Sequence, residues 1–130
     1  MLYFDSSALI NLVVERDPVE DLIEFIDGHS KTPMGTSTIG FTETVRGAAE
    51  HGQYPTLMAE LEANFSELAL TEEIRDLAAH LPGWIRTLDA LHVATALSIG
   101  DYLTVLISYD RRMLAIAKEQ GLPVASPGMN

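Results

Sequence analysis

Four acidic residues stand apart from the other acids of this 130-residue chain because of the segments in which they lie. Asp5 closes a short apolar run at residues 2–4, and Asp110 follows the apolar run at residues 103–107 by three positions. Both runs are typical of buried strands. Glu43 lies among small and apolar residues of a predicted helix, and Asp89 lies in the first turn of another predicted helix. If the two strands are parallel neighbours, Asp5 and Asp110 emerge at the same edge of a sheet.

Each of these acids also has a purely structural interpretation. The two acids that follow strands suit helix N-caps, the first-turn acid suits the positive end of a helix, and Glu43 suits a solvated helix face. The glycines near Glu43 favour a site, because Gly40 and Gly47 lie on its helical face. A glycine inside a helix costs about 1 kcal/mol relative to alanine. We therefore expect something to approach the backbone closely there.

Carboxylates that gather in one place need a compensating charge. Two charges 4 Å apart repel by about 4 kcal/mol at an effective dielectric constant of 20. Such a cluster therefore either takes up protons, with raised pKa values, or holds divalent cations. Oxygen ligands favour Mg²⁺ or Mn²⁺ over Zn²⁺. One or two of these ions would support hydrolysis of a phosphodiester bond.

Half of the cationic side chains accompany the proposed ligands. Of eight Lys and Arg residues, four lie within three positions of one of the acids: Arg46, Arg86, Arg111 and Arg112. Arginine suits phosphate contacts, although each one could also balance neighbouring acids at the surface. Ser6 and Asn11 are candidates for lining the same groove, while capping and ordinary helix surface explain them equally well.

The elements that must position these residues alternate between strands and helices. Strands are predicted at residues 2–4, 32–35, 65–70, 103–107 and 122–125, and helices at 7–15, 38–50, 56–64 and 87–99. Further helices carry the apolar face of Val19 and Leu22, begin at Thr71, and follow Asp110. This alternation predicts one α/β domain over residues 1–130, with a central parallel sheet in three α/β/α layers. Sites in such sheets lie at the carboxyl ends of the strands.

Composition limits the function classes. Eight basic and 19 acidic residues give a net charge of −11, so the protein does not attract nucleic acid through its overall charge. The absence of cysteine excludes disulfides, thiolate nucleophiles and cysteine zinc sites. The apolar runs are too short to span a membrane, and the N-terminus does not have the pattern of a signal peptide. We therefore expect a cytoplasmic protein with no membrane partner.

Four blocks together resemble the PIN-domain nucleases, and specifically the VapC-type toxins of type II toxin–antitoxin systems. The blocks are LYFDSSALINL at residues 2–12, ETVRG at 43–47, DALHVATA at 89–96 and SYDRRML at 108–114. The tail at residues 117–127, with GLPV at 121–124, also resembles the family. Ser108 is a small departure, since relatives often carry threonine there, and either hydroxyl would serve to orient a ligand or water.

The resemblance implies a Mg²⁺- or Mn²⁺-dependent endoribonuclease with an α/β/α fold. It implies Asp5, Glu43, Asp89 and Asp110 as the catalytic, metal-binding cluster, with Asp5 and Asp89 foremost as direct ligands. The partners that it implies are an RNA substrate, a second copy of the chain in a homodimer, and a cognate antitoxin whose tail lies in the active-site groove. The candidate substrate-binding residues are Ser6, Asn11, Arg46, Arg86, Ser108, Arg111 and Arg112.

Other interpretations stay open at this point. The cluster acts on phosphate and does not itself read the sugar, so a metal-dependent DNA nuclease is the alternative enzyme. A non-catalytic module whose acids receive a basic protein partner is the alternative outside catalysis. His92, one turn after Asp89, is expected to pack or to make an outer hydrogen bond rather than to bind an ion. Trp84 suits either the core or a dimer contact.

Overall fold

A five-stranded, all-parallel sheet forms the middle layer of the computed structural model, which describes residues 1–129. Its order is β3-β2-β1-β4-β5, so β1 lies at the centre. The strands are β1 (Leu2–Phe4), β2 (Met34–Ser37), β3 (Ser66–Leu68), β4 (Val105–Ile107) and β5 (Val124–Ala125). The predicted α/β class with a central parallel sheet is confirmed.

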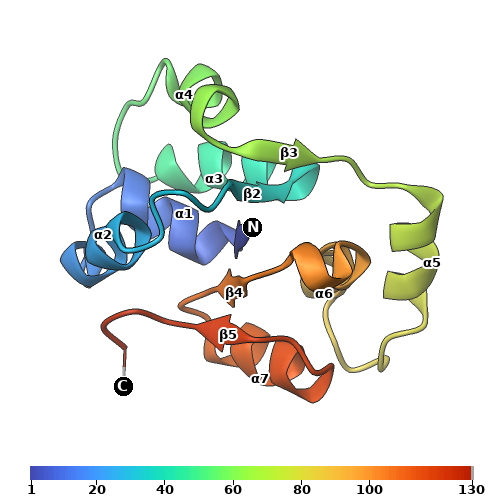
Figure 1. Cartoon of the computed structure of the whole chain (residues 1–130). Helices are drawn as coiled ribbons and strands as arrows, with labels where there is room; N and C mark the ends of the chain where they lie inside the picture. Colours follow the sequence, from blue (N-terminus) through green and yellow to red (C-terminus); the bar gives the residue numbers. More distant parts are fainter. Residues whose placement is uncertain (130) are drawn as a thin grey trace.

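In the described part of the chain, residues 1–129, seven α-helices cover the two faces of the sheet (Figure 1). One face carries α1 (Ser6–Val13), α2 (Val19–Asp27), α3 (Thr38–Ala48) and α4 (Leu57–Asn64), and the other carries α5 (Glu72–Ala79), α6 (Thr87–Ser98) and α7 (Arg111–Glu119). A short 3₁₀ helix, η1 (Gly100–Tyr102), precedes β4. Alternation along β1 divides the core, because Leu2 and Phe4 pack with residues of α1 and α2 while Tyr3 packs with residues of α6 and α7.

The strand order reverses direction between β1 and β4. The chain builds β1, β2 and β3 outward on one side and then returns to place β4 beside β1 on the other. β1 and β4 pair in parallel, with Phe4 opposite Ile107. Side chains that follow these two strands therefore emerge at the same edge. In open α/β sheets this reversal point forms a crevice at the carboxyl ends of the strands, where ligands bind.

Element boundaries differ from the expected ones where one residue serves two elements. The expected strand at residues 32–35 is displaced to Met34–Ser37, because Ser37 both ends β2 and caps α3 by accepting a hydrogen bond from the backbone of Gly40. The first helix begins at Ser6 rather than at residue 7, since Asp5 is its N-cap. It ends at Val13, two residues early, and Glu15 then adopts a left-handed backbone with φ 55°.

The close approach expected at the two α3 glycines exists, but the protein's own side chains make it. A Cβ atom at Gly40 would lie 2.0 Å from Thr36 Oγ1, and one at Gly47 would lie 2.4 Å from Ile10 Cδ1. These glycines therefore let α3 lie against β2 and α1. The close approach is thus present, and because Thr36 and Ile10 make it, these glycines do not by themselves indicate a ligand site.

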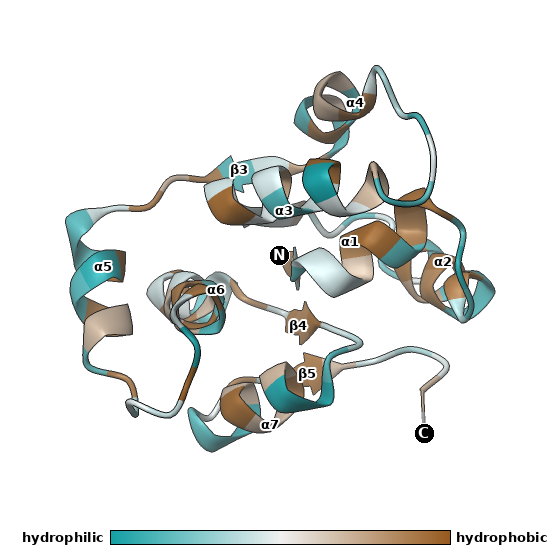
Figure 2. Cartoon of the chain, turned by 180° about the vertical axis from the view of Figure 1, so that it is seen from behind, coloured by the Kyte–Doolittle hydropathy of each residue, from teal (hydrophilic) through white to brown (hydrophobic). Residues whose placement is uncertain are grey.

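Hydropathy differs between buried strands of the sheet and an exposed helix turn. Figure 2 shows β4 and β5 in the hydrophobic colour, whereas the acidic first turn of α5 is hydrophilic. Within residues 1–129, no helix is both long enough and apolar enough to cross a membrane.

Candidate active site

Four acids from four separate segments line one cavity of about 350 Å³ at the carboxyl edge of β1 and β4. Asp5 follows β1, Glu43 lies in the middle of α3, Asp89 lies in the first turn of α6, and Asp110 caps α7. The structure thus brings together the four residues that the sequence singled out. They come from both helical layers, and they meet where the strand order reverses.

Asp5 is the most deeply buried of the four, with 3% of its surface exposed. Its Oδ1 accepts hydrogen bonds from the Ser7 hydroxyl at 2.7 Å and from the Ala8 backbone at 3.0 Å. Its Oδ2 accepts from the Ser108 hydroxyl at 2.5 Å. Burial raises the pKa of the Asp5 carboxyl, and the hydrogen bonds from Ser108, Ser7 and Ala8 partly oppose that rise.

Two serine hydroxyls join the ends of β1 and β4 around this carboxylate. Ser108 is fully buried and accepts a hydrogen bond from the backbone of Asp110 at 3.0 Å, while Ser7 accepts one from the backbone of Tyr109 at 2.9 Å. Each hydroxyl therefore donates to Asp5 and accepts from the segment after β4. The placement of Asp5 and Asp110 at one edge is held by specific bonds as well as by strand pairing.

Asp110 has the capping role that its sequence position suggested. Its Oδ1 accepts from the backbone of Arg112 at 2.9 Å and of Met113 at 3.4 Å. Asp5 caps α1 in the same way through Ala8. The structural and the chemical interpretations are compatible, because a carboxylate has about four lone-pair positions and a cap uses one or two of them.

Glu43 does not lie on a freely solvated face. Its side chain is 27% exposed, and Oε1 lies 2.7 Å from Nε2 of the buried His92. His92 also lines the cavity. The outer hydrogen bond expected for this histidine is therefore present.

Asp89 is half-buried, and the other acids of the cluster affect its pKa. Its pKa is raised, first by burial and then by the negative charge of Asp110, with Glu43 adding a smaller effect. Arg86 and His92 act in the opposite direction. The acids are thus close enough for their charges to interact, which is the condition under which carboxylates bind protons or cations.

The donor set fits a hard divalent cation, although it is not preassembled around one point. No group of three or more His, Asp and Glu side chains among residues 1–129 has the geometry of a formed metal site. Oxygens remain available, because no hydrogen bond within these residues engages Oε2 of Glu43, Oδ2 of Asp110 or either oxygen of Asp89. Side-chain rotation at Asp89 and Asp110 would be needed to close a coordination shell.

The candidate substrate-binding residues fall into two groups. Ser6 and Arg86 line the acidic cavity, and Ser108 lies behind it against Asp5. Arg46 lines a neighbouring hollow that also includes Glu43 and Leu88. Five of the seven candidates do not line the acidic cavity: Asn11, Arg46, Ser108, Arg111 and Arg112.

Asn11 differs most from the expectation. Its side chain is buried, and Oδ1 accepts a hydrogen bond from Nε of Arg16 at 3.2 Å. This contact fixes the end of α1 instead of lining the groove. Trp84 is 60% exposed, so it is not a core residue.

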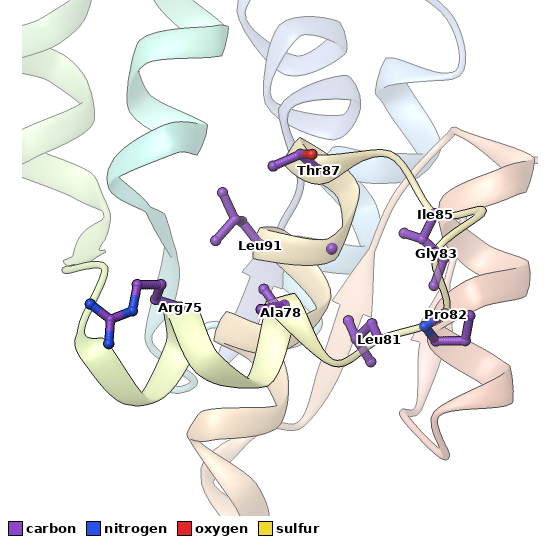
Figure 3. A pocket seen from close by; sticks show the side chains of 10 residues that line it. Arg75, Ala78, Leu81, Pro82, Gly83, Ile85, Thr87 and Leu91 are labelled. Carbon is purple, nitrogen blue, oxygen red and sulfur yellow. The ribbon is translucent and has the colours of Figure 1, made fainter.

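A larger cavity, about 430 Å³, lies between α5, the loop before α6, and α6 itself (Figure 3). Its lining is mostly apolar, with Leu81, Ile85 and Leu91 among its residues. Its only charged side chain, Arg75, forms an exposed ion pair with Asp76. Volume alone therefore does not identify a functional site, because the smaller cavity is the one that holds the four acids.

Sequence reasoning missed Ser7 and Tyr3. Ser7 lies two residues after an aspartate that ends a strand, a spacing typical of local side-chain hydrogen bonds. Tyr3 lies inside a buried strand, and its hydroxyl contacts Nδ1 of His92 at 2.7 Å. A buried tyrosine hydroxyl requires a partner, but the sequence does not indicate which residue supplies it.

Comparisons with known proteins identify the family of the chain. The PIN domain family model matches residues 2–119. Ribonuclease VapC47 of Mycobacterium tuberculosis is 35% identical over 98% of both chains, and Ribonuclease VapC46 of the same species is 32% identical over 97% of both.

Solved structures share the fold at lower identity. A toxin–antitoxin complex from Klebsiella pneumoniae matches with a TM-score of 0.70 and 22% identity, over 98% of both chains. The structure of FitAB bound to an IR36 DNA fragment matches with a TM-score of 0.72 and 16% identity, over 100% of this chain and 97% of that one. With the family model and the close relatives spanning nearly its whole length, the chain belongs to the PIN domain family, among the VapC-type proteins.

Proposed function

We propose that this VapC-type protein is an endoribonuclease whose acidic cavity binds Mg²⁺ or Mn²⁺ through Asp5, Glu43, Asp89 and Asp110. The observation that carries the proposal is the convergence of these acids, from four segments, in one cavity at the edge of β1 and β4. Helix capping accounts for two of them separately. It does not account for four carboxylates that share a cavity with one arginine.

The chemistry of the donor set supports Mg²⁺ or Mn²⁺, because every candidate ligand is a carboxylate. When bound, a divalent cation supplies positive charge that polarises the phosphate and lowers the pKa of an attacking water. It also supplies the attraction for RNA that a chain with net charge −11 lacks.

The chain's own residues have distinct tasks in this proposal. Asp5 is the fixed ligand, because three hydrogen bonds hold its carboxylate in place. Asp89 and Asp110 are the adjustable ligands, since each is less buried and keeps an oxygen without a protein partner among residues 1–129. Arg86 lines the cavity and binds a phosphate oxygen of the substrate. Arg46 extends this binding into the neighbouring hollow.

RNA is the proposed substrate because the similar proteins are named ribonucleases. The partners proposed with it are a cognate antitoxin and a second copy of the chain, and the proposed location is the cytoplasm. The toxin–antitoxin complex that shares the fold supports the antitoxin. Two exposed apolar side chains support a dimer contact: Leu88, which lines the cavity and is 48% accessible, and Trp84, which is 60% accessible. Sedimentation of Trp84→Ser tests this contact, and an unchanged mass would exclude it.

One assay separates ribonuclease, DNA nuclease and binding module. Labelled structured RNA and matching DNA are incubated with the protein plus Mg²⁺, Mn²⁺ or EDTA. The variants are Asp5→Asn and Asp89→Asn, with Asp101→Asn as a control that removes an equal charge from an exposed position. We expect cleavage of RNA only, abolished by EDTA and by the first two variants. Equal cleavage of DNA would favour a DNA nuclease, and partner binding without cleavage would favour an acidic module.

A further inference from the structure

His92 connects the acidic cavity to the centre of the sheet. Its ring is 2% exposed, and both of its nitrogens have partners. Nδ1 lies 2.7 Å from the hydroxyl of Tyr3 on β1, and Nε2 lies 2.7 Å from Oε1 of Glu43 on α3. Three elements from all three layers of the fold thus meet through one imidazole.

For a neutral imidazole, the donors and acceptors in this series of hydrogen bonds have one consistent assignment. Tyr3 is fully buried, and burial raises its pKa well above the ordinary value, so its hydroxyl keeps the proton. An ionised carboxylate only accepts hydrogen bonds. The Tyr3 hydroxyl therefore donates to Nδ1, and the proton on Nε2 is donated to Glu43. The tyrosine thereby selects the tautomer of His92 that can hold the glutamate.

This arrangement differs from that of a histidine that merely fills the core. Neither ring nitrogen has a free lone pair for a cation, so His92 is not a ligand. Its contact with Glu43 uses only Oε1, and no protein group among residues 1–129 engages Oε2. A hydrogen bond to one oxygen restricts the carboxylate while the other stays available, which is how outer hydrogen bonds orient metal ligands.

We infer that His92 is a positioning residue, oriented by Tyr3, that holds the Glu43 carboxylate in place to bind the divalent cation. This inference rests on the proposed function, because it requires that Glu43 contacts the ion. Without the imidazole, Glu43 gains rotational freedom that must be lost again when the ion binds.

The test is the affinity for Mn²⁺, measured by the electron paramagnetic resonance signal of free Mn²⁺, alongside RNA cleavage. We expect His92→Leu to weaken Mn²⁺ binding about 10- to 100-fold. Tyr3→Phe should weaken it less, since Nε2 still reaches Glu43 without a fixed tautomer. His92→Gln should restore most of the affinity, because its amide can donate near the position of Nε2.

Two controls make the outcome specific. Thr95 is buried on the same helix and donates to the Leu91 carbonyl at 2.6 Å, so Thr95→Val perturbs α6 without touching Glu43 and should leave Mn²⁺ affinity unchanged. In a Glu43→Gln background, His92→Leu should have no further effect. If His92→Leu does not fold, the test compares the Mn²⁺ affinities of Tyr3→Phe and His92→Gln with that of the wild-type protein.

Two results distinguish the failure of this inference from failure of the proposed function. Wild-type Mn²⁺ binding and RNA cleavage with unaltered affinity in His92→Leu and Tyr3→Phe would overturn the positioning role alone. No Mn²⁺ binding and no cleavage by the wild-type protein would overturn both.

Discussion

Replacing Ser108 by alanine tests whether a buried hydroxyl holds Asp5 at the edge of the sheet. The Ser108 hydroxyl donates to Asp5 Oδ2 at 2.5 Å and accepts from the Asp110 backbone at 3.0 Å. Ser108 is fully buried, so water does not replace these bonds without rearrangement. The substitution removes one bond to a charged acceptor and leaves one backbone N–H without its partner.

The magnitude follows from these two losses. A hydrogen bond to a charged group contributes about 1.5–3 kcal/mol, and an unpaired buried donor costs about 1–3 kcal/mol. Because Asp110 is only half-buried, we take the low end for the second effect and expect the free energy of unfolding to fall by about 3 kcal/mol. For a chain of this length that corresponds to a decrease in Tm of roughly 10 °C.

The measurement is thermal and urea unfolding in EDTA at pH 7, with Ser98→Ala as the matched control. The Ser98 hydroxyl donates only to the Thr95 carbonyl, at 2.6 Å, so its loss should cost about 1 kcal/mol or less. RNA cleavage by Ser108→Ala should fall about 10- to 100-fold, because Asp5 loses its orientation. Equal stability of the two variants would refute this reasoning, as would an undiminished effect of Ser108→Ala in an Asp5→Asn background.

Three further predictions concern packing, protons and metal. Gly40→Ala places a Cβ 2.0 Å from Thr36 Oγ1 and should cost about 1–3 kcal/mol in urea unfolding, whereas Gly83→Ala, with open space around it, should be neutral; equal stabilities would contradict the packing argument. Burial raises the pKa of Asp5 and Asp89, so their contribution to stability is fully present below the ordinary aspartate pKa and is lost as pH rises through the raised values. The metal-free protein should therefore lose stability with rising pH less steeply when both are asparagine, and parallel unfolding curves would contradict this. Mg²⁺ at 100 times its dissociation constant should add about 2.7 kcal/mol, and a thermal shift that persists in Asp89→Asn would exclude Asp89 as a ligand.

Much of the fold was predictable because its signals are local. Val19 and Leu22 lie on one face of α2, and the cap at Thr71 places α5 within one residue of its observed start. The strands β1 and β4 were predicted from two apolar runs, each followed by an aspartate, and their parallel pairing, which the sequence left as a condition, is present. The boundary at β2 was missed because Ser37 belongs to a strand by pairing and to a helix by its side chain, a conflict that only tertiary contacts resolve.

The site was predictable in its acids and not in the groups that hold them. A carboxylate after a strand can be recognised from its neighbours in sequence. The partners of His92 lie 89 and 49 residues away, so no local pattern indicates them. Likewise, Gly40 and Gly47 signalled close approach correctly, but their partners were Thr36 and Ile10 rather than a ligand.

The placement of the acids at helix starts explains how this chain tolerates the cluster. Asp5 is the N-cap of α1, Asp110 is the N-cap of α7, and Asp89 lies in the first turn of α6. A helix N-terminus carries about half a positive charge and stabilises a nearby anion by about 0.3–1 kcal/mol, more where it is partly buried. The starts of these three helices therefore lie beside the cavity, whose lining among residues 1–129 contains a single arginine, Arg86. The helix starts therefore offset part of the repulsion among the acids. Burial, and after it the negative charge of Asp110, still keeps the pKa of Asp89 raised, so positive charge beside Asp89 would be favourable, as the proposed binding of a divalent ion requires.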